Sequence, residues 1–336
     1  MRIVVIGAGI IGSLYGARLA IAGQDVTLLA RGARLSELRR CPIKLVNDED
    51  GAVTAVSLKA IATLDPADNY DLALVMVRAD QVDDLLPQLA ANLGVKTFLF
   101  MHNRAAGSTA LAAAVGPERT LLGFPGAGGQ RDGETIRYRL IAEQSTTLGE
   151  PGGSLSPRLR AIAEIFETGG FRVVLNRRMD DWLKTHAVFV TAIAGAIYLA
   201  DGNMAALAAN RDSVRTLVRG VRQGFHALKI AAISIEPKKL ALLFALPSIF
   251  PEGYWARYLA RPAADLIFAR HARSSPGEML RLVEELRMIM PQEPQKRKDL
   301  EALWAAVADA AIQSPSIPKP AGTTLASLAT GPISAA

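Results

Sequence analysis

Residues 2–12 of the chain read Arg-Ile-Val-Val-Ile-Gly-Ala-Gly-Ile-Ile-Gly, and this stretch decides the fold. The apolar run Ile3–Ile6 indicates a buried strand, and a helical pattern follows the G-x-G-x-x-G string. In such a unit the first glycine allows a tight turn, the second lets the backbone approach a pyrophosphate, and the third lets the helix pack on the strand. The candidate cofactor-binding residues are therefore Gly7, Ala8, Gly9, Ile10, Ile11 and Gly12. The alternative is a glycine turn in an α/β domain that binds no dinucleotide.

The next strand, Asp25–Leu29, ends at Ala30-Arg31-Gly32, where the choice between NAD and NADP is usually made. An NAD site places an acid here for the ribose hydroxyls, whereas this chain has Ala30 and Arg31, with Arg34 close behind. A guanidinium can pair bidentately with a 2′-phosphate, and an acid would repel it. We therefore predict NADP(H) as the cofactor and Arg31 as a cofactor-binding residue. The alternative for Arg31 is a solvated turn residue.

Short β-rich runs alternate with helical patterns through the first 175 residues. Further strand candidates are Asp71–Val77 and Lys96–Met101, and helical patterns cover Ile11–Ala22 and Gln81–Leu89. This alternation predicts a Rossmann-type, doubly wound parallel sheet. Additional strands are expected at Thr135–Ile141, Thr146–Leu148 and Arg172–Leu175, and a glycine-rich loop at Gly123–Gly133.

From about Arg177 to Gln313 only helical periodicity is found. We expect helical segments at Ser213–Ile230, Glu252–Ala272, Gly277–Met290 and Asp299–Ile312. The predicted organisation is an NADP-binding domain at 1–175, an all-helical substrate and dimerisation domain at 176–313, and a flexible tail at 314–336 rich in Pro, Ser, Thr, Gly and Ala. Long apolar helices in the second domain are compatible with a homodimer.

Composition narrows the class of protein. The chain has 336 residues, half of them hydrophobic, with a net charge of +6 and one cysteine, Cys41. Basic residues are scattered rather than gathered with aromatics in a stripe, so nucleic-acid binding is not expected. No uninterrupted apolar run reaches the roughly 18 residues of a membrane span, and the apolar run after Arg2 is too short for a secretory signal. The four histidines lack metal-ligand spacing, so we predict no metal site. The single cysteine fits a reducing compartment, so we expect a cytoplasmic protein.

The order of motifs resembles the ketopantoate reductase family, over nearly the whole chain. The residues that carry the resemblance are Gly7–Gly12, Ala30-Arg31, His102-Asn103, Gln130-Arg131-Asp132-Gly133 and Asp181-Trp182-Leu183-Lys184. The family reduces 2-dehydropantoate to pantoate with NADPH, in pantothenate biosynthesis. The resemblance implies that Lys184 is the catalytic lysine, that Glu278 is the substrate glutamate, and that Asn103 lies beside the cofactor. An ammonium can stabilise the oxygen that gains negative charge during ketone reduction, and a carboxylate can orient the substrate.

Several positions depart from the family pattern. Val188 and Ala192 stand where the family has asparagines, which predicts a larger or more hydrophobic carbonyl substrate. Arg78 replaces a lysine after the fourth strand, which keeps the charge but changes its geometry. After His102-Asn103 the chain continues Arg104-Ala105-Ala106-Gly107, where the family usually has glycine directly.

Each candidate residue also has a structural explanation. Lys184 could form a surface pair with Asp180 or Asp181, Glu278 could be a first-turn acid of a helix, and Asn103 could be a turn former. The functional hypothesis is an NADPH-dependent reductase of a 2-keto acid or related carbonyl compound, acting in a cleft between the domains. The alternatives are an NADP-binding redox sensor or scaffold without reductase activity, and a dehydrogenase of another alcohol.

Overall fold

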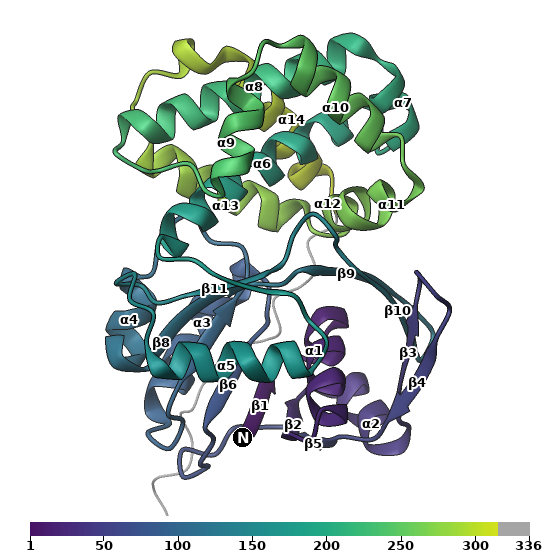
Figure 1. Cartoon of the computed structure of the whole chain (residues 1–336), viewed down its shortest axis with the longest axis vertical. Coiled ribbons are helices and arrows are strands. Elements are labelled where there is room, and N and C mark those ends of the chain that lie inside the picture. Colours follow the sequence, from purple (N-terminus) through teal and green to yellow (C-terminus); the bar gives the residue numbers. More distant parts are fainter. Residues whose placement is uncertain (315–336) are drawn as a thin grey trace, which may run out of the picture.

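The computed structural model describes residues 1–314, in which a sheet-containing N-terminal part lies against a helical part (Figure 1). The predicted tail at 314–336 lies, apart from Ser314, outside the described residues. The large sheet has eight strands, ordered in space as β12 (Val173–Leu175), β11 (Thr146–Gly149), β8 (Thr120–Phe124), β7 (Phe98–Met101), β6 (Leu72–Val75), β1 (Arg2–Ile6), β2 (Asp25–Leu29) and β5 (Lys59–Ile61). Every neighbouring pair is parallel except β11 with β8. This confirms the predicted doubly wound sheet.

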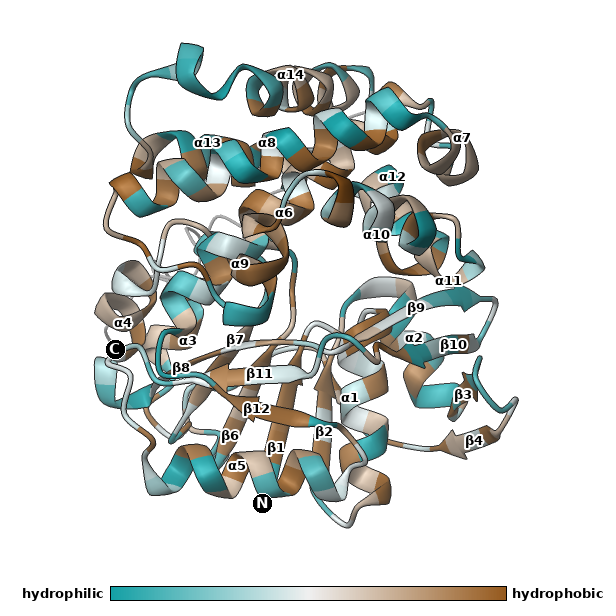
Figure 2. Cartoon of the chain, turned by 45° about the horizontal axis from the view of Figure 1, so that its top comes forward, coloured by the Kyte–Doolittle hydropathy of each residue, from teal (hydrophilic) through white to brown (hydrophobic). Residues whose placement is uncertain are grey.

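Side chains of the central strands alternate between two apolar layers. Ile3 and Val5 pack with helices α1 (Ile10–Ile21) and α5 (Pro157–Thr168), whereas Val4 and Ile6 pack with α3 (Ala79–Ala91) and α4 (Thr109–Val115). Burial on both faces explains why these strands are continuously apolar rather than alternating. The strands are correspondingly brown in Figure 2, where colour follows hydropathy.

A second sheet, not anticipated from the sequence, lies at one side of the first (Figure 1). Its order is β4 (Val53–Val56), β3 (Ile43–Asn47), β10 (Thr135–Leu140) and β9 (Ala127–Asp132). The prediction of a glycine-rich loop at Gly123–Gly133 was wrong, since the segment ends β8 and forms β9. A Cβ on Gly129 would lie 2.9 Å from Ile10 Cγ2, so glycine serves here for close packing against α1 rather than for a loop.

Everything after β12 is helical up to Ser314, as predicted. The helices are α6 (Met179–Leu199), α7 (Met204–Ala209), α8 (Arg211–Ile230), α9 (Lys238–Ala245), α10 (Ile249–Leu259), α11 (Pro262–Ala264), the π-helical turn η2 (Asp265–Ala269), α12 (Arg270–Ser274), α13 (Pro276–Ile289) and α14 (Lys298–Gln313). Two short 3₁₀ turns, η1 (Pro117–Arg119) and η3 (Pro294–Arg297), and helix α2 (Gly32–Arg40) complete the elements. The single helix expected over Glu252–Ala272 is interrupted after Leu259, just before Pro262, because proline cannot supply the backbone N–H of a continuing helix.

Helix α6 forms the centre of the helical part. By length and composition it is the one helix among residues 1–314 that could cross a membrane, but 72% of its apolar window is buried inside the protein. It contacts α8, α13 and α14, and its buried side chains belong to one apolar cluster with theirs. Its apolar character is therefore accounted for by packing.

Candidate active site

The glycine loop between β1 and α1 has the geometry that its motif predicts. Gly7 has φ +107°, and a Cβ there would lie 2.6 Å from the carbonyl oxygen of Met76. A Cβ on Gly12 would lie 2.0 Å from the carbonyl oxygen of Gly7, so α1 can approach the turn only without a side chain. Around Gly9, by contrast, no atom of residues 1–314 other than those of its chain neighbours lies within 4 Å of the Cβ position. The loop thus combines two closely packed glycines with one whose side-chain direction is open.

The first turn of α1 begins at Ile10, with Gly9 as its N-cap and no side chain capping it. Such a helix end leaves backbone N–H groups without an intrahelical partner, and these favour an anionic ligand. The loop is braced from one side only: the carbonyl oxygen of Ala8 accepts hydrogen bonds from Ser13 Oγ and Arg34 Nε, both at 3.1 Å. This arrangement fits a dinucleotide pyrophosphate at the open Gly9 side.

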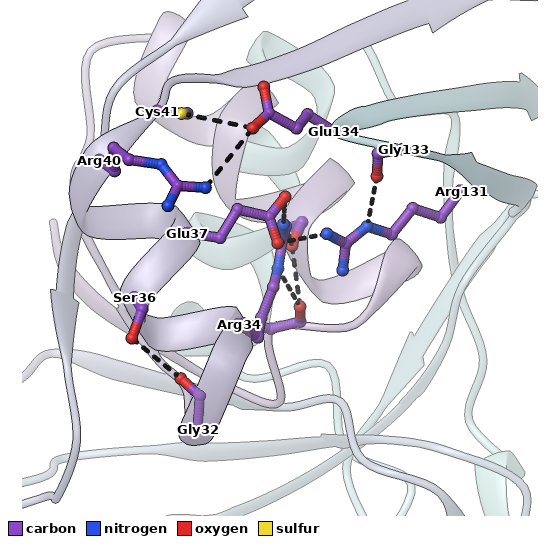
Figure 3. A network of polar contacts seen from close by, with 11 residues as sticks. Gly32, Arg34, Ser36, Glu37, Arg40, Cys41, Arg131, Gly133 and Glu134 are labelled. Carbon is purple, nitrogen blue, oxygen red and sulfur yellow. Dashed lines mark hydrogen bonds and ion pairs between the residues drawn. The ribbon is translucent and has the colours of Figure 1, made fainter.

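The two arginines after β2 have different surroundings, and Figure 3 shows those of Arg34. Arg34 is fully engaged, because it also donates to Ser13 Oγ at 2.8 Å and to Glu37 Oε1 at 2.9 Å. Arg131 of β9 forms a second ion pair with Glu37. Burial would raise the pKa of Glu37, but the two guanidinium groups outweigh it and lower that pKa. Arg31 is exposed, and among residues 1–314 no hydrogen bond or ion pair involves its guanidinium, so it remains free to bind an anion.

Asn103 and Glu278, which are 175 residues apart in the sequence, lie in direct contact where the two parts of the molecule meet. Asn103 follows β7, and its Nδ2 donates to Glu278 Oε1 over 3.1 Å. Both residues are almost fully buried, at 8% and 4% exposure. Glu278 lies in the first turn of α13, where an acid stabilises a helix. It also accepts a hydrogen bond from Asn103, so stabilising the helix is not its only contact. We call the loop 102–107, Lys184 and Glu278 the junction.

Lys184 reaches the same loop from α6. A Cβ on Gly107 would lie 3.8 Å from Lys184 Nζ and 3.7 Å from Asp180 Oδ1. The alternative of a surface pair with Asp180 or Asp181 is not what the structure shows. Asp180 accepts from Ser108 Oγ at 2.6 Å, Asp181 accepts from the Ser234 amide at 3.2 Å, and no carboxylate among the described residues lies within 4 Å of Lys184 Nζ.

Glu285, which sequence reasoning missed, holds the junction loop in place. Its Oε2 accepts from the backbone amides of Ala105 at 2.7 Å and Ala106 at 3.0 Å, and Arg281 donates to its Oε1 at 3.1 Å. Its spacing of seven residues from Glu278 places both carboxylates on one face of α13. That spacing is the signal from which Glu285 could have been found.

His271 of α12 was also missed as a site residue. Its Nε2 lies 3.3 Å from Glu278 Oε2. Burial would raise the pKa of Glu278, but His271, Asn103 and the backbone amide of Ala79 outweigh it and lower that pKa. Burial would likewise lower the pKa of His271, and the contact with Glu278 outweighs it and raises that pKa. The two side chains therefore favour each other's charged form.

Several buried polar atoms at the junction have no hydrogen-bond partner among the described residues. They include both ring nitrogens of His102, Asn103 Oδ1 and Asp180 Oδ1. Burial, followed by the charge of Arg104, lowers the pKa of His102 to about 3, so its ring is neutral at physiological pH. Buried polar groups nearly always have a hydrogen-bond partner. A cluster of buried groups without partners therefore marks a place where water or a ligand would supply them. Asn103 Oδ1 and Asp180 Oδ1 are acceptors, and a neutral His102 ring offers one donor and one acceptor, so the set fits a ligand that both donates and accepts, such as a hydroxyl or amide group.

Val188 and Ala192 do not line the junction. Both are fully buried in the core of the helical part, and a Cβ on Gly224 of α8 would lie 2.4 Å from Val188 Cγ1. The inference of a more hydrophobic substrate from these two positions is therefore corrected, because their side chains fill space between helices. Two cavities, of about 460 and 270 Å³, lie elsewhere, and neither is lined by Lys184, Asn103 or Glu278.

Comparison with known proteins gives one family. Residues 3–153 match the family described as ketopantoate reductase PanE/ApbA. A 2-dehydropantoate 2-reductase of Halobacterium salinarum is 26% identical over 239 residues, which are 70% of this chain and 78% of that protein. Those of Mesorhizobium japonicum and Pyrococcus abyssi are 27% and 35% identical over 55% and 57% of this chain. These two alignments span 63% and 62% of the relatives, less than two thirds of their length.

Solved structures extend the similarity to the whole fold. A 2-dehydropantoate 2-reductase from Geobacter metallireducens superposes with a TM-score of 0.71 at 15% identity, over 92% of this chain and 100% of that one. A D-mandelate dehydrogenase in complex with NADH gives 0.69 at 14% identity, with the same coverage of both chains. At these identities the likeness shows a shared two-domain fold.

Proposed function

We propose that this chain, whose residues 3–153 match the ketopantoate reductase family, is an NADP(H)-dependent reductase of a 2-keto acid or related carbonyl compound. The observation that carries the proposal is the meeting of Asn103, Glu278 and Lys184 at one loop, with no carboxylate of residues 1–314 paired to Lys184. This loop follows β7, at the sheet edge where α/β proteins bind ligands.

The junction also lies close to the glycine loop. A substrate at the junction would therefore lie near a cofactor bound at that loop, as hydride transfer requires. Gly7 packs against Met76 and Val77, at the end of β6. Two residues further on, the backbone amide of Ala79 lies close enough to Glu278 to help lower the pKa of its carboxyl. We therefore assign cofactor binding to residues 1–175 and substrate binding chiefly to residues 176–313.

The mechanism follows from the side chains at the junction. The bound nicotinamide supplies the hydride that reduces the carbonyl carbon. As negative charge develops on the carbonyl oxygen, Lys184 donates a hydrogen bond and then a proton from Nζ. Glu278 and Asn103 hold the substrate in one orientation, since each is itself fixed by the other.

A turnover assay tests this proposal. Purified protein is mixed with NADPH and a panel of 2-keto acids, 2-dehydropantoate included, and the loss of NADPH absorbance is followed. Lys184→Ala should reduce kcat/KM by at least about a hundredfold, because a positioned proton donor contributes 10² or more. The matched control is Lys229→Ala, which removes an exposed lysine of α8 and should change nothing. Tight NADPH binding without turnover of any carbonyl would favour the redox sensor instead.

Selectivity for NADP(H) is proposed to reside in Arg31. Its exposed guanidinium has no partner among residues 1–314 and lies two residues after β2, and no acid stands at Ala30. Arg31→Asp should weaken NADPH binding by about ten- to a hundredfold, as expected for a lost charge-assisted pair, and leave NADH binding nearly unchanged. Arg39→Asp, an exposed arginine on the same helix, is the control. Equal losses for both cofactors in fluorescence titrations would contradict a 2′-phosphate contact.

We also propose a cytoplasmic homodimer that associates through the helical part. Large apolar side chains are exposed on α9, on α10 and in the turn between them, namely Leu242, Leu246, Ile249 and Phe250. Apolar surface of this kind commonly marks an interface between subunits. Light scattering on the purified protein should give twice the chain mass of 35.8 kDa, and Ile249→Lys should shift it toward the monomer.

A further inference from the structure

His271 lies against Glu278, one of the residues assigned to the substrate, and the two form an ion pair when His271 is protonated. His271 lies on α12 and Glu278 on α13, with 3.3 Å between Nε2 and Oε2. The glutamate side chain is 3% exposed and the histidine side chain 41% exposed. His271 Nε2, which faces Glu278, is itself buried, so solvent reaches the ring away from that contact, and Glu278 depends on its protein neighbours for compensation.

The groups facing this pair come from every element packed against it. Glu278 meets the Asn103 amide and the backbone amide of Ala79. His271 is influenced by the positive charge of Arg78, which is itself paired bidentately with Asp80, and it acts in turn on the buried, neutral ring of His186. Among residues 1–314, His271 is thus the only cationic side chain within 4 Å of Glu278.

The charge of a 2-keto acid makes this pair important. The substrate of the proposed function carries a carboxylate, and an uncompensated Glu278 carboxylate beside it would repel it. With His271 protonated, the pair is neutral overall, and the positive charge of Lys184 is left to attract the anion. With His271 neutral, the negative charge of Glu278 opposes binding.

Resting on the proposed function, we propose that His271 is a positioning and specificity-determining residue that neutralises Glu278 and so adapts the site to an anionic keto acid. Protonation is favoured below the pKa of His271, which Glu278 raises against the opposing effect of burial. As pH rises through that pKa, the KM for a 2-keto acid rises. The KM for the corresponding uncharged methyl ester stays level over the same range.

The test compares His271→Gln with wild type on one 2-keto acid and its methyl ester, from pH 6 to pH 9. The variant should show a KM for the acid about tenfold higher at low pH, without pH dependence, as expected for one lost neighbouring charge. Its kcat, and its KM for the ester, should stay within about twofold of wild type. His226→Gln removes an exposed histidine of α8 and serves as the matched control. Equal rises in KM for the acid and the ester would show a merely structural role and overturn the proposal.

Calorimetric binding of the same two compounds to the NADPH-loaded full chain separates this inference from the proposed function. Selective, pH-dependent binding of the acid that is lost in His271→Gln, without turnover, supports the role of His271 and rejects the reductase. Turnover whose acid preference persists in His271→Gln supports the reductase and rejects the role of His271. Absence of binding by either compound overturns both.

Discussion

Glu285→Ala should release the loop that carries Asn103 from the helical part. The carboxylate of Glu285 is 4% exposed and accepts the amides of Ala105 at 2.7 Å and Ala106 at 3.0 Å. Ala105 is fully buried, so its amide would lose its acceptor without gaining water. That charge-assisted bond is worth about 1.5–3 kcal/mol. The exposed Ala106 amide can turn to water and adds only about 0.5 kcal/mol, so the expected destabilisation is about 2–3.5 kcal/mol.

The measurement is urea denaturation of the full chain, together with hydrogen exchange of the peptide spanning residues 102–108. Glu285→Ala should lower the unfolding midpoint and accelerate exchange in that peptide. The control is Glu284→Ala, the neighbouring glutamate on α13, which is exposed and has no hydrogen bond among residues 1–314. That variant should stay within about 0.5 kcal/mol of wild type.

Glu285→Gln sharpens the interpretation, because glutamine keeps one acceptor oxygen but no charge. It should fall between wild type and the alanine variant. If Glu285→Ala unfolds at the same urea concentration as Glu284→Ala, with unchanged exchange at residues 102–108, the carboxylate does not anchor the loop and the reasoning is refuted.

Further substitutions test the glycine loop and an ion pair in the sheet-containing part. Gly12→Ala should destabilise the protein by about 2 kcal/mol or more, because its Cβ would lie 2.0 Å from the Gly7 oxygen, and thermal unfolding will measure this. Gly9→Ala should keep wild-type stability, since nothing lies within 4 Å, yet weaken NADPH in a fluorescence titration if the pyrophosphate passes there. Arg158→Met should cost about 3 kcal/mol at pH 7 by leaving the buried carboxylate of Glu150 without its cation. Burial would raise the pKa of Glu150, but Arg158 and Ser156 outweigh it and lower that pKa below 4.5. The ion pair therefore stabilises the fold above pH 4.5, and this stabilisation is lost as pH falls through the folded-state pKa of Glu150. Urea curves of this variant and wild type should therefore converge in acid, and a constant difference down to pH 3 would contradict the assignment.

The sequence by itself determined the features that depend on local rules. Gly7 has the positive φ of a tight turn, and Gly12 packs against the Gly7 carbonyl, so both constraints act within a dozen residues. The buried strands were recognised because a sheet covered on both faces demands continuous apolar runs. Lys184, Asn103 and Glu278 were singled out as well, with the help of the family resemblance, although their roles stay predictions.

Only the tertiary structure decided what these residues contact. Glu285 looked like an ordinary helix acid, yet it meets amides 180 and 179 residues away. Val188 looked like part of a substrate site, yet it faces Gly224 in the core. His271 could be assigned no partner, since its contact with Glu278 depends on the angle between two successive helices. Periodicity shows which face of a helix is buried, but the identity of the group opposite depends on how distant segments pack, and that information is not contained in any local pattern.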